Sequence, residues 1–277
     1  GLLGSKERRS DISMDKNVYK SNESTVLYGV PKVAFGMYDG CTPYPTCLKA
    51  CSEYLGEDLE YFYTMASSAA AFRLVWNTEC WDLSNVDIFH TLEENNSIYG
   101  LGAEALGREF AFLGREKDTS KEEFIQFIKT HIDEGYPCIA LGIIGPPEPC
   151  IITGYRKNGE ELLGWNFFQE DPEFAANVEF DEAGYFISRN WWENTDTQAV
   201  MCMGAIKGEK ISDRDIIVNA IKTLTGRQEG SYQKGVLAYD AWKAALIKES
   251  EFTVSDNLFV LFEKMLCQMD AMTCVAD

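Results

Sequence analysis

The chain has 277 residues, of which 45% are hydrophobic and 13% aromatic, a composition that supports a packed core and excludes an intrinsically disordered protein. Its formal net charge is −19, so nucleic acid and acidic membrane surfaces are repelled, and we expect neither as a partner. No apolar run has the length of a membrane span, and the nine cysteines are irregularly spaced, which favours a cytoplasmic protein with reduced thiols.

The N-terminal part of the sequence predicts a tail, a strand and a helix. Residues 1–24 are polar and aperiodic, so we expect a flexible tail or linker there. The apolar run over residues 26–35 predicts a strand, although a glycine and a proline interrupt it. Residues 45–55 predict a helix, because a proline opens the segment and Gly56 follows its last residue.

The middle of the chain alternates between helical and strand patterns. Residues 102–106 predict a short helix and residues 109–113 a strand. The clearest helix is predicted over residues 120–134, where Ser120 and Glu123 have the spacing of a capping box. The next strands are expected at 137–144, at 150–155 and 161–166 as a hairpin around Asn158-Gly159, and at 185–187 and 199–206.

Beyond residue 206 the pattern changes to helices. We expect them at 213–224, 235–248 and 256–275, and we place the domain boundaries at 1–24 for the tail, 25–207 for an α+β domain and 208–277 for a helical extension. The last helix reaches Asp277 without a capping residue, which indicates that the natural chain continues. Its apolar residues, among them Leu258, Phe262, Met265 and Met269, favour a homo-oligomer through the C-terminal helices.

Three stretches carry a resemblance to a known fold. Gly135-Tyr136-Pro137-Cys138-Ile139-Ala140 resembles the run before the first core strand of the bacteriocin-processing peptidase group, and Cys150-Ile151-Ile152-Thr153-Gly154-Tyr155 resembles the strand that follows. Residues 40–56 resemble the nucleophile-bearing segment, and residues 30–206 together resemble the N-terminal domain of the butirosin biosynthesis protein H family. The resemblance implies an α+β, papain-like core with a central antiparallel sheet, followed by the C-terminal helical extension.

The same resemblance places a catalytic triad that is incomplete in this chain. Papain-type catalysis needs a thiolate at a helix N-terminus, a histidine, and an Asn or Asp that orients the histidine. The nucleophile position falls near Pro43, with Cys41 and Cys47 as the nearest thiols, while Asn166 takes the third position and Glu148 replaces the histidine. A carboxylate at Glu148 can act as a base toward an amine or water but suits a thiol poorly, because two negative charges repel each other. The candidate catalytic residues are therefore Cys41, Glu148 and Asn166.

The chain has two histidines, and neither has an evident catalytic place. His131 lies on the capped helix beside Phe127 and Ile128, and we interpret it as structural. His90 falls in a stretch that we cannot assign to an element, so its entry into the site from elsewhere stays open.

A binding pocket is expected where strands end in aromatic and amide side chains. The candidate ligand-binding residues are Pro43, Tyr44, Trp165, Asn166 and Gln169. We predict no metal and no cofactor, since Cys47 and Cys51 lack further ligands and no phosphate-binding or dinucleotide motif is present.

Three functions follow as hypotheses. The first is a catalytically degenerate member that binds a small molecule in the former active-site cleft, favoured by the missing histidine. The second, implied by the resemblance, is an acyl- or aminoacyltransferase that moves an acyl group from a carrier-protein thioester to an amine, with proteolysis ranked last. The third is an assembly or interaction module that uses the apolar terminal helix.

Overall fold

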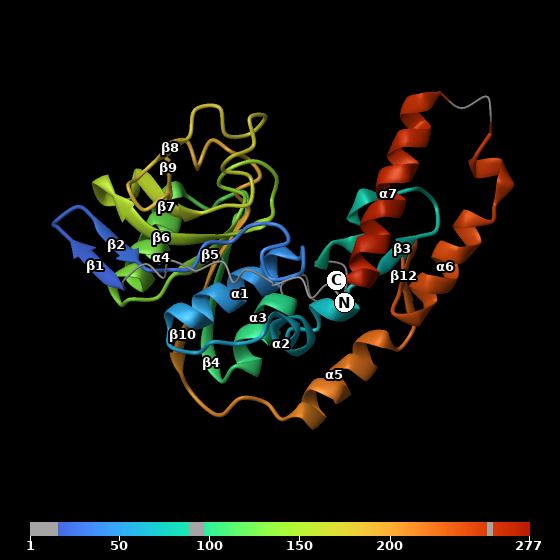
Figure 1. The fold of residues 1–277 in the computed structure, drawn as a ribbon, viewed down its shortest axis with the longest axis horizontal. Helices are drawn as coiled ribbons and strands as arrows, with labels where there is room; N and C mark the ends of the chain where they lie inside the picture. Colours follow the sequence, from blue (N-terminus) through green and yellow to red (C-terminus); the bar gives the residue numbers. More distant parts are fainter. Residues whose placement is uncertain (1–15, 89–96, 254–256) are drawn as a thin grey trace, which may run out of the picture.

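The computed structural model describes residues 16–88, 97–253 and 257–277, which form a mixed α+β fold (Figure 1). The helices are α1 (Pro43–Tyr54), α2 (Tyr61–Ser67), α3 (Ser97–Ala105), α4 (Lys121–Asp133), α5 (Asp213–Leu224), α6 (Val236–Leu246) and α7 (Leu258–Ala276). The strands are β1 (Asn17–Lys20), β2 (Thr25–Tyr28), β3 (Val75–Asn77), β4 (Arg108–Gly114), β5 (Cys138–Leu141), β6 (Pro149–Arg156), β7 (Glu161–Trp165), β8 (Glu179–Phe180), β9 (Phe186–Ser188), β10 (Ala199–Ile206), β11 (Arg227–Glu229) and β12 (Tyr232–Lys234). Within these ranges no helix has the length and apolarity needed to cross a membrane.

The main sheet has the strand order β4-β10-β5-β6-β7-β9-β8, with β2 paired to β6 and β1 paired to β2. Every pairing between the described strands is antiparallel, as predicted. Helix α1 packs against β6, α3 against β4, and α4 against β2, β6 and β10. In Figure 1 the sheet occupies the left half of the molecule, and the C-terminal helices α5, α6 and α7 form a separate group on the right.

Several elements agree with the sequence patterns. Ser120 and Glu123 form the predicted capping box of α4, with each backbone N–H donating to the other residue's side chain. Strand β10 and helix α5 cover the expected residues. Helix α1 begins two residues before the predicted proline, because Thr42 is the N-cap and Pro43 already has helical geometry.

The N-terminal segment differs from the expected tail. Asn17–Lys20 form strand β1, which pairs with β2 in register from Asn17 opposite Tyr28 to Lys20 opposite Thr25. The side chains of β1 are exposed, so the strand forms through backbone pairing, which a hydrophobicity pattern does not reveal. Strand β2 ends at Tyr28 and does not continue to residue 35, since Gly29 takes a left-handed φ of 92°.

The C-terminal extension is not purely helical, and its small sheet includes strand β3 from the preceding domain. Strands β11 and β12 form a hairpin, and β12 pairs with β3. A second small core surrounds this three-stranded sheet, and the Trp76 ring of β3 stacks on the Trp242 ring of α6 with 5.9 Å between centroids. The buried residues of this core are Leu74, Trp76, Ala238, Cys267, Ala271 and Cys274.

Candidate functional site

A cleft of about 320 Å³ lies where the start of α1, the loop between β5 and β6, and helix α7 meet. Four sequence-predicted residues line it together: Cys41, Pro43, Tyr44 and Glu148. The other lining residues are Phe35, Thr42, Arg73, Leu83, Ser84, Val86, Asp87, Ile88, Tyr99, Pro147, Pro149, Asp270 and Thr273. The meeting of α7 with α1 is visible in Figure 1 beside the C label.

Tyr44 is fixed as one wall of this cleft. Its hydroxyl donates to the carbonyl oxygen of Tyr99 across 2.6 Å, and the two rings meet edge to face with centroids 4.7 Å apart. The approach depends on Gly102 of α3, because a Cβ at that position would lie 2.5 Å from the Tyr44 hydroxyl oxygen. Close packing of α3 against α1 therefore sets the shape of the wall.

Cys41 lies at the mouth of the cleft, just before α1, and its side chain is exposed. Its backbone N–H donates to Oδ1 of Asp277 across 2.8 Å. The same carboxylate, 3% exposed, also accepts hydrogen bonds from the hydroxyls of Thr42 and Tyr61 and lies 3.6 Å from the Arg73 guanidinium. This N–H is therefore occupied by a protein carboxylate and is not available to stabilise a negatively charged oxygen of a substrate.

Glu148 faces the cleft from the loop between β5 and β6. Its backbone oxygen accepts from the Gly142 N–H at 3.1 Å, which holds the loop against the end of β5. Water reaches its side chain, yet the surrounding protein raises the pKa of its carboxyl group to about 7. Desolvation is the largest cause, the negative charge of Asp87 adds to it, Arg73 opposes it, and Asp270 makes a smaller addition. Glu148 can therefore gain or lose a proton near neutral pH.

Trp165, Asn166 and Gln169 lie outside the lining of this cleft, contrary to the expectation for ligand contacts. The Asn166 side chain donates to the Gly142 carbonyl at 2.9 Å and accepts from the Phe168 N–H at 2.9 Å. Gln169 accepts from the Asn166 N–H, and Trp165 donates its indole N–H to the Val30 carbonyl. Asn166 thus fixes the beginning of the loop that carries Glu148, and both ends of its amide group bond within the protein.

Neither histidine is found in the cleft. His131 lies on α4, with its ring edge to face on Phe127 at 4.6 Å, and it lines a different hollow. His90 lies outside the described residues. In the described part of the chain, the cleft is therefore a site of carboxylates, one guanidinium, one thiol and aromatic rings.

The sequence did not single out Arg73, Asp87, Tyr99 or Asp270 as parts of the cleft. These residues come from four separate segments, and none belongs to a motif, so only the tertiary fold brings them together. Burial raises the pKa of Asp270 above its ordinary value. Three carboxyl groups thus line the same cleft as one guanidinium that already pairs with Asp277, and the electrostatic environment favours a cation.

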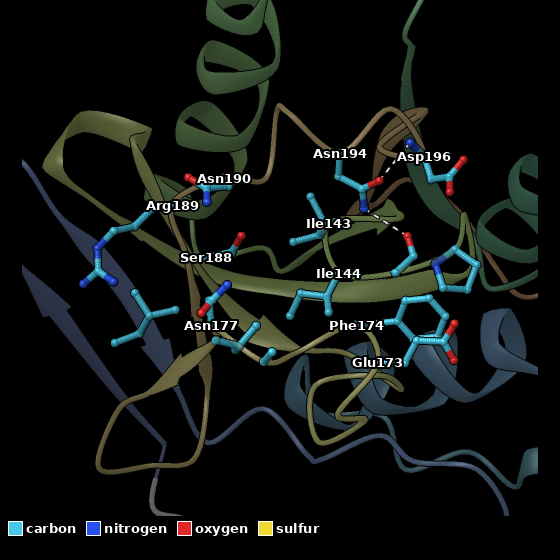
Figure 2. Close-up of a pocket in the computed structure, with 15 residues that line it drawn as sticks. Ile143, Ile144, Glu173, Phe174, Asn177, Ser188, Arg189, Asn190, Asn194 and Asp196 are labelled. Atoms are coloured by element: carbon cyan, nitrogen blue, oxygen red, sulfur yellow. Dashed lines mark hydrogen bonds between the residues drawn. The ribbon is translucent and has the colours of Figure 1, made fainter.

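A wider hollow of about 660 Å³ lies between the beginning of the β5–β6 loop and the segment around Phe174 (Figure 2). Figure 2 shows Asn194 bonded at both ends of its amide, donating to the Gly145 carbonyl at 2.9 Å and accepting from the Asp196 N–H at 3.0 Å. Arg189 pairs with Glu161 and Glu179. Because Asn194 and Arg189 already bond to other groups of the protein, we do not propose ligand binding in this hollow.

No group of three metal-ligating side chains is assembled within the ranges that the structure describes. All nine cysteines are unpaired thiols. Comparison with protein-family models, curated proteins and solved structures finds no match to this chain.

Proposed function

We propose that this chain is a papain-like protein without the catalytic histidine, and that it binds a small amine-bearing molecule in the 320 Å³ cleft. The observation that carries the proposal is the convergence of Asp87, Glu148 and Asp270 on one concave surface. The papain-like assignment is supported by the position of Glu148, which stands where the resemblance expects the histidine and lines the same cleft as Cys41. Nine unpaired cysteines support a reducing, cytoplasmic location.

The chemistry of the lining selects the ligand class. A protonated amine brought near these carboxyl groups relieves their mutual repulsion and lowers the pKa of Glu148 toward its ordinary value. The apolar side chains of Leu83, Val86 and Ile88 line the same cleft and suit a hydrocarbon or aromatic body attached to the amine. The volume of the cleft is at the lower end of the range for small-ligand pockets.

Thermal unfolding in the presence of benzylamine tests this proposal, with benzyl alcohol as the neutral probe of the same shape. We expect benzylamine to raise the unfolding temperature of the wild-type protein more than benzyl alcohol does. Glu148→Gln should remove that difference, whereas Glu173→Gln, an exposed carboxylate in the other hollow, should keep it. Equal stabilisation by the two probes, or an undiminished effect in Glu148→Gln, would reject the amine assignment.

Acyl transfer is the second candidate, because the exposed thiol of Cys41 and the carboxyl group of Glu148 line one cleft. In this function Cys41 accepts an acyl group from a carrier-protein thioester, and Glu148 takes the proton from the attacking amine. Intact mass after exposure to a small acyl thioester decides the question. An adduct that maps to Cys41 supports transfer, and its absence while the thioester is intact excludes a covalent Cys41 step.

Assembly through α7 is the third candidate, with a second copy of the chain as the partner. Leu258, Phe262, Met265, Met269 and Met272 alternate in spacings of four and three residues and are between 48% and 84% exposed. This is the spacing of a coiled-coil seam. The flanking positions Leu261, Leu266, Gln268 and Val275 carry no charge, so two copies of this acidic chain do not repel each other along the seam.

A further inference from the structure

Two cysteines lie directly opposite each other on neighbouring strands of the main sheet. Cys138 of β5 and Cys202 of β10 are paired residues in the antiparallel ladder. Residues opposed in this way project to the same face of a sheet, with Cα atoms about 4.5 or 5.5 Å apart. Both separations fall within the range of about 4.4–6.8 Å that a disulfide requires. The backbone separation of the two residues is therefore compatible with a disulfide.

His131 of α4 approaches one of these two thiols. A hydrogen bond to Cys202 is the largest cause of a raised pKa of the imidazole, and the charge of Glu134 adds to it. The pKa of Cys202 is lowered, first by its hydrogen bond with Cys138 and also by His131, against the opposing effects of burial and Glu134. Burial raises the pKa of Cys138 well above its ordinary value, so Cys202 is the more acidic of the two thiols.

Of the two thiols, Cys202 is the one that lines a hollow. A pocket of about 610 Å³ is lined by His131 and Cys202 together with Glu109, Glu134, Tyr136 and Lys207. Cys202 itself is only 1% exposed, and its Sγ lies 3.8 Å from the Pro137 carbonyl oxygen. Such a recessed sulfur admits a small reagent and excludes a large one. Cys51 of α1 is a third buried thiol close to the pair.

We propose that Cys202, His131 and Cys138 form an oxidation site that takes a small hydroperoxide and closes a Cys138–Cys202 disulfide. The Cys202 thiolate attacks the terminal oxygen of the hydroperoxide, a sulfur–oxygen bond forms, and the oxygen–oxygen bond breaks. Sulfur is oxidised, the peroxide is reduced, and the leaving alkoxide or hydroxide takes the proton from the His131 imidazolium. The Cys138 thiol then displaces the hydroxyl of the Cys202 sulfenic acid, and water leaves with the Cys138 proton.

Disulfide mapping after limited oxidation tests this inference. The reduced, folded protein is treated with hydrogen peroxide at an equimolar dose, the remaining thiols are blocked with N-ethylmaleimide, and peptides are analysed without reduction. We expect a cross-linked peptide containing Cys138 and Cys202 at a dose that leaves the exposed thiols of Cys41 and Cys80 largely alkylated. Earlier oxidation of Cys41 or Cys80, or a bond from Cys202 to Cys51, would overturn the proposal.

Two variants separate the roles of the partners. Cys138→Ser should stop the reaction at the sulfenic acid, which peptide mass spectrometry detects as one added oxygen on Cys202. His131→Gln should slow the oxidation of Cys202 by about 10-fold or more, while Gln126→Ala, on the exposed face of the same helix, should leave the rate unchanged. Unchanged thermal unfolding confirms that each variant is folded. Wild-type rates in folded His131→Gln would remove His131 from the site.

Discussion

The backbone N–H of Cys41 and the carboxylate of Asp277 form a 2.8 Å hydrogen bond that attaches the end of α7 to the segment just before α1. The carboxylate is almost fully buried and also accepts from Thr42 and Tyr61, beside the Arg73 guanidinium. One side chain therefore connects the C-terminal helices to the α+β core, and it does so at the rim of the proposed binding cleft.

The substitution Asp277→Asn tests this connection, because it keeps the shape of the side chain and removes its charge. We expect it to lower the free energy of unfolding by roughly 3 kcal/mol, since a buried acceptor of several hydrogen bonds and an ion pair is lost. Urea unfolding followed by tryptophan fluorescence measures the change. Asp118→Asn, an exposed carboxylate on the loop before α4, is the matched control and should have little effect. Equal effects of the two variants would mean that Asp277 does not stabilise the docking of α7.

Glu148 gives the protein a pH-dependent stability of unusual sign for a carboxyl group. The pKa of Glu148 is about 7 in the folded protein, above the value of about 4.3 expected in the unfolded chain. Between these values the folded state binds more protons than the unfolded state, so stability falls as the pH rises through this window.

Replacing Glu148 by Gln should remove that dependence. The variant should gain stability relative to the wild type between about pH 5 and about pH 8, by around 1 kcal/mol because the side chain keeps contact with water. Urea midpoints of both proteins at the two pH values provide the measurement. A constant difference between the two proteins across this range would show that Glu148 has an ordinary pKa.

At Gly102 the wall of the cleft has no room for a larger side chain. A methyl group there would meet the Tyr44 hydroxyl at 2.5 Å and the Leu48 side chain at 3.1 Å. We expect Gly102→Ala to cost about 1–3 kcal/mol of stability and to weaken benzylamine binding, since Tyr44 must move. Gly208→Ala, where nothing lies within 4 Å of the added carbon, should change neither quantity. Wild-type stability of Gly102→Ala would mean that α3 and α1 are free to separate.

The apolar seam on α7 predicts self-association. Met269 lies in its middle and is 52% exposed, so Met269→Glu should shift the protein toward the monomer in sedimentation velocity experiments. Phe62→Glu places the same charge on a 71% exposed residue of α2 and should leave the association unchanged. A wild-type protein that is monomeric at every concentration measured would contradict a role of α7 in pairing two copies.

Local sequence signals predicted much of the fold. The capping box at Ser120 and Glu123 predicted α4, the apolar run at 199–206 predicted β10, and the Asn158-Gly159 turn predicted the β6–β7 hairpin. Strand β1 was missed because both of its faces are exposed, and β3 because its partner β12 comes from the distant C-terminal part of the chain. The local hydrophobicity pattern of the sequence reveals neither pairing.

The candidate site was predicted in part for the same reason. Cys41, Pro43, Tyr44 and Glu148 converge on one cleft, since each lies next to a helix or strand end that the sequence identified. Asn166 follows β7 as expected, but its amide donates to the Gly142 carbonyl and does not line the cleft. The opposition of Cys138 and Cys202 requires the register between β5 and β10, which no single strand pattern contains.

The central claim is that a cation binds against Glu148, and proton release on binding tests it most directly. Titration calorimetry of benzylamine at about pH 7 in two buffers of different ionisation enthalpy gives the number of protons exchanged. Binding of the ammonium group should lower the pKa of Glu148, so the wild type should release a fraction of a proton and Glu148→Gln none. Binding without proton release, or equal release from both proteins, would contradict the account.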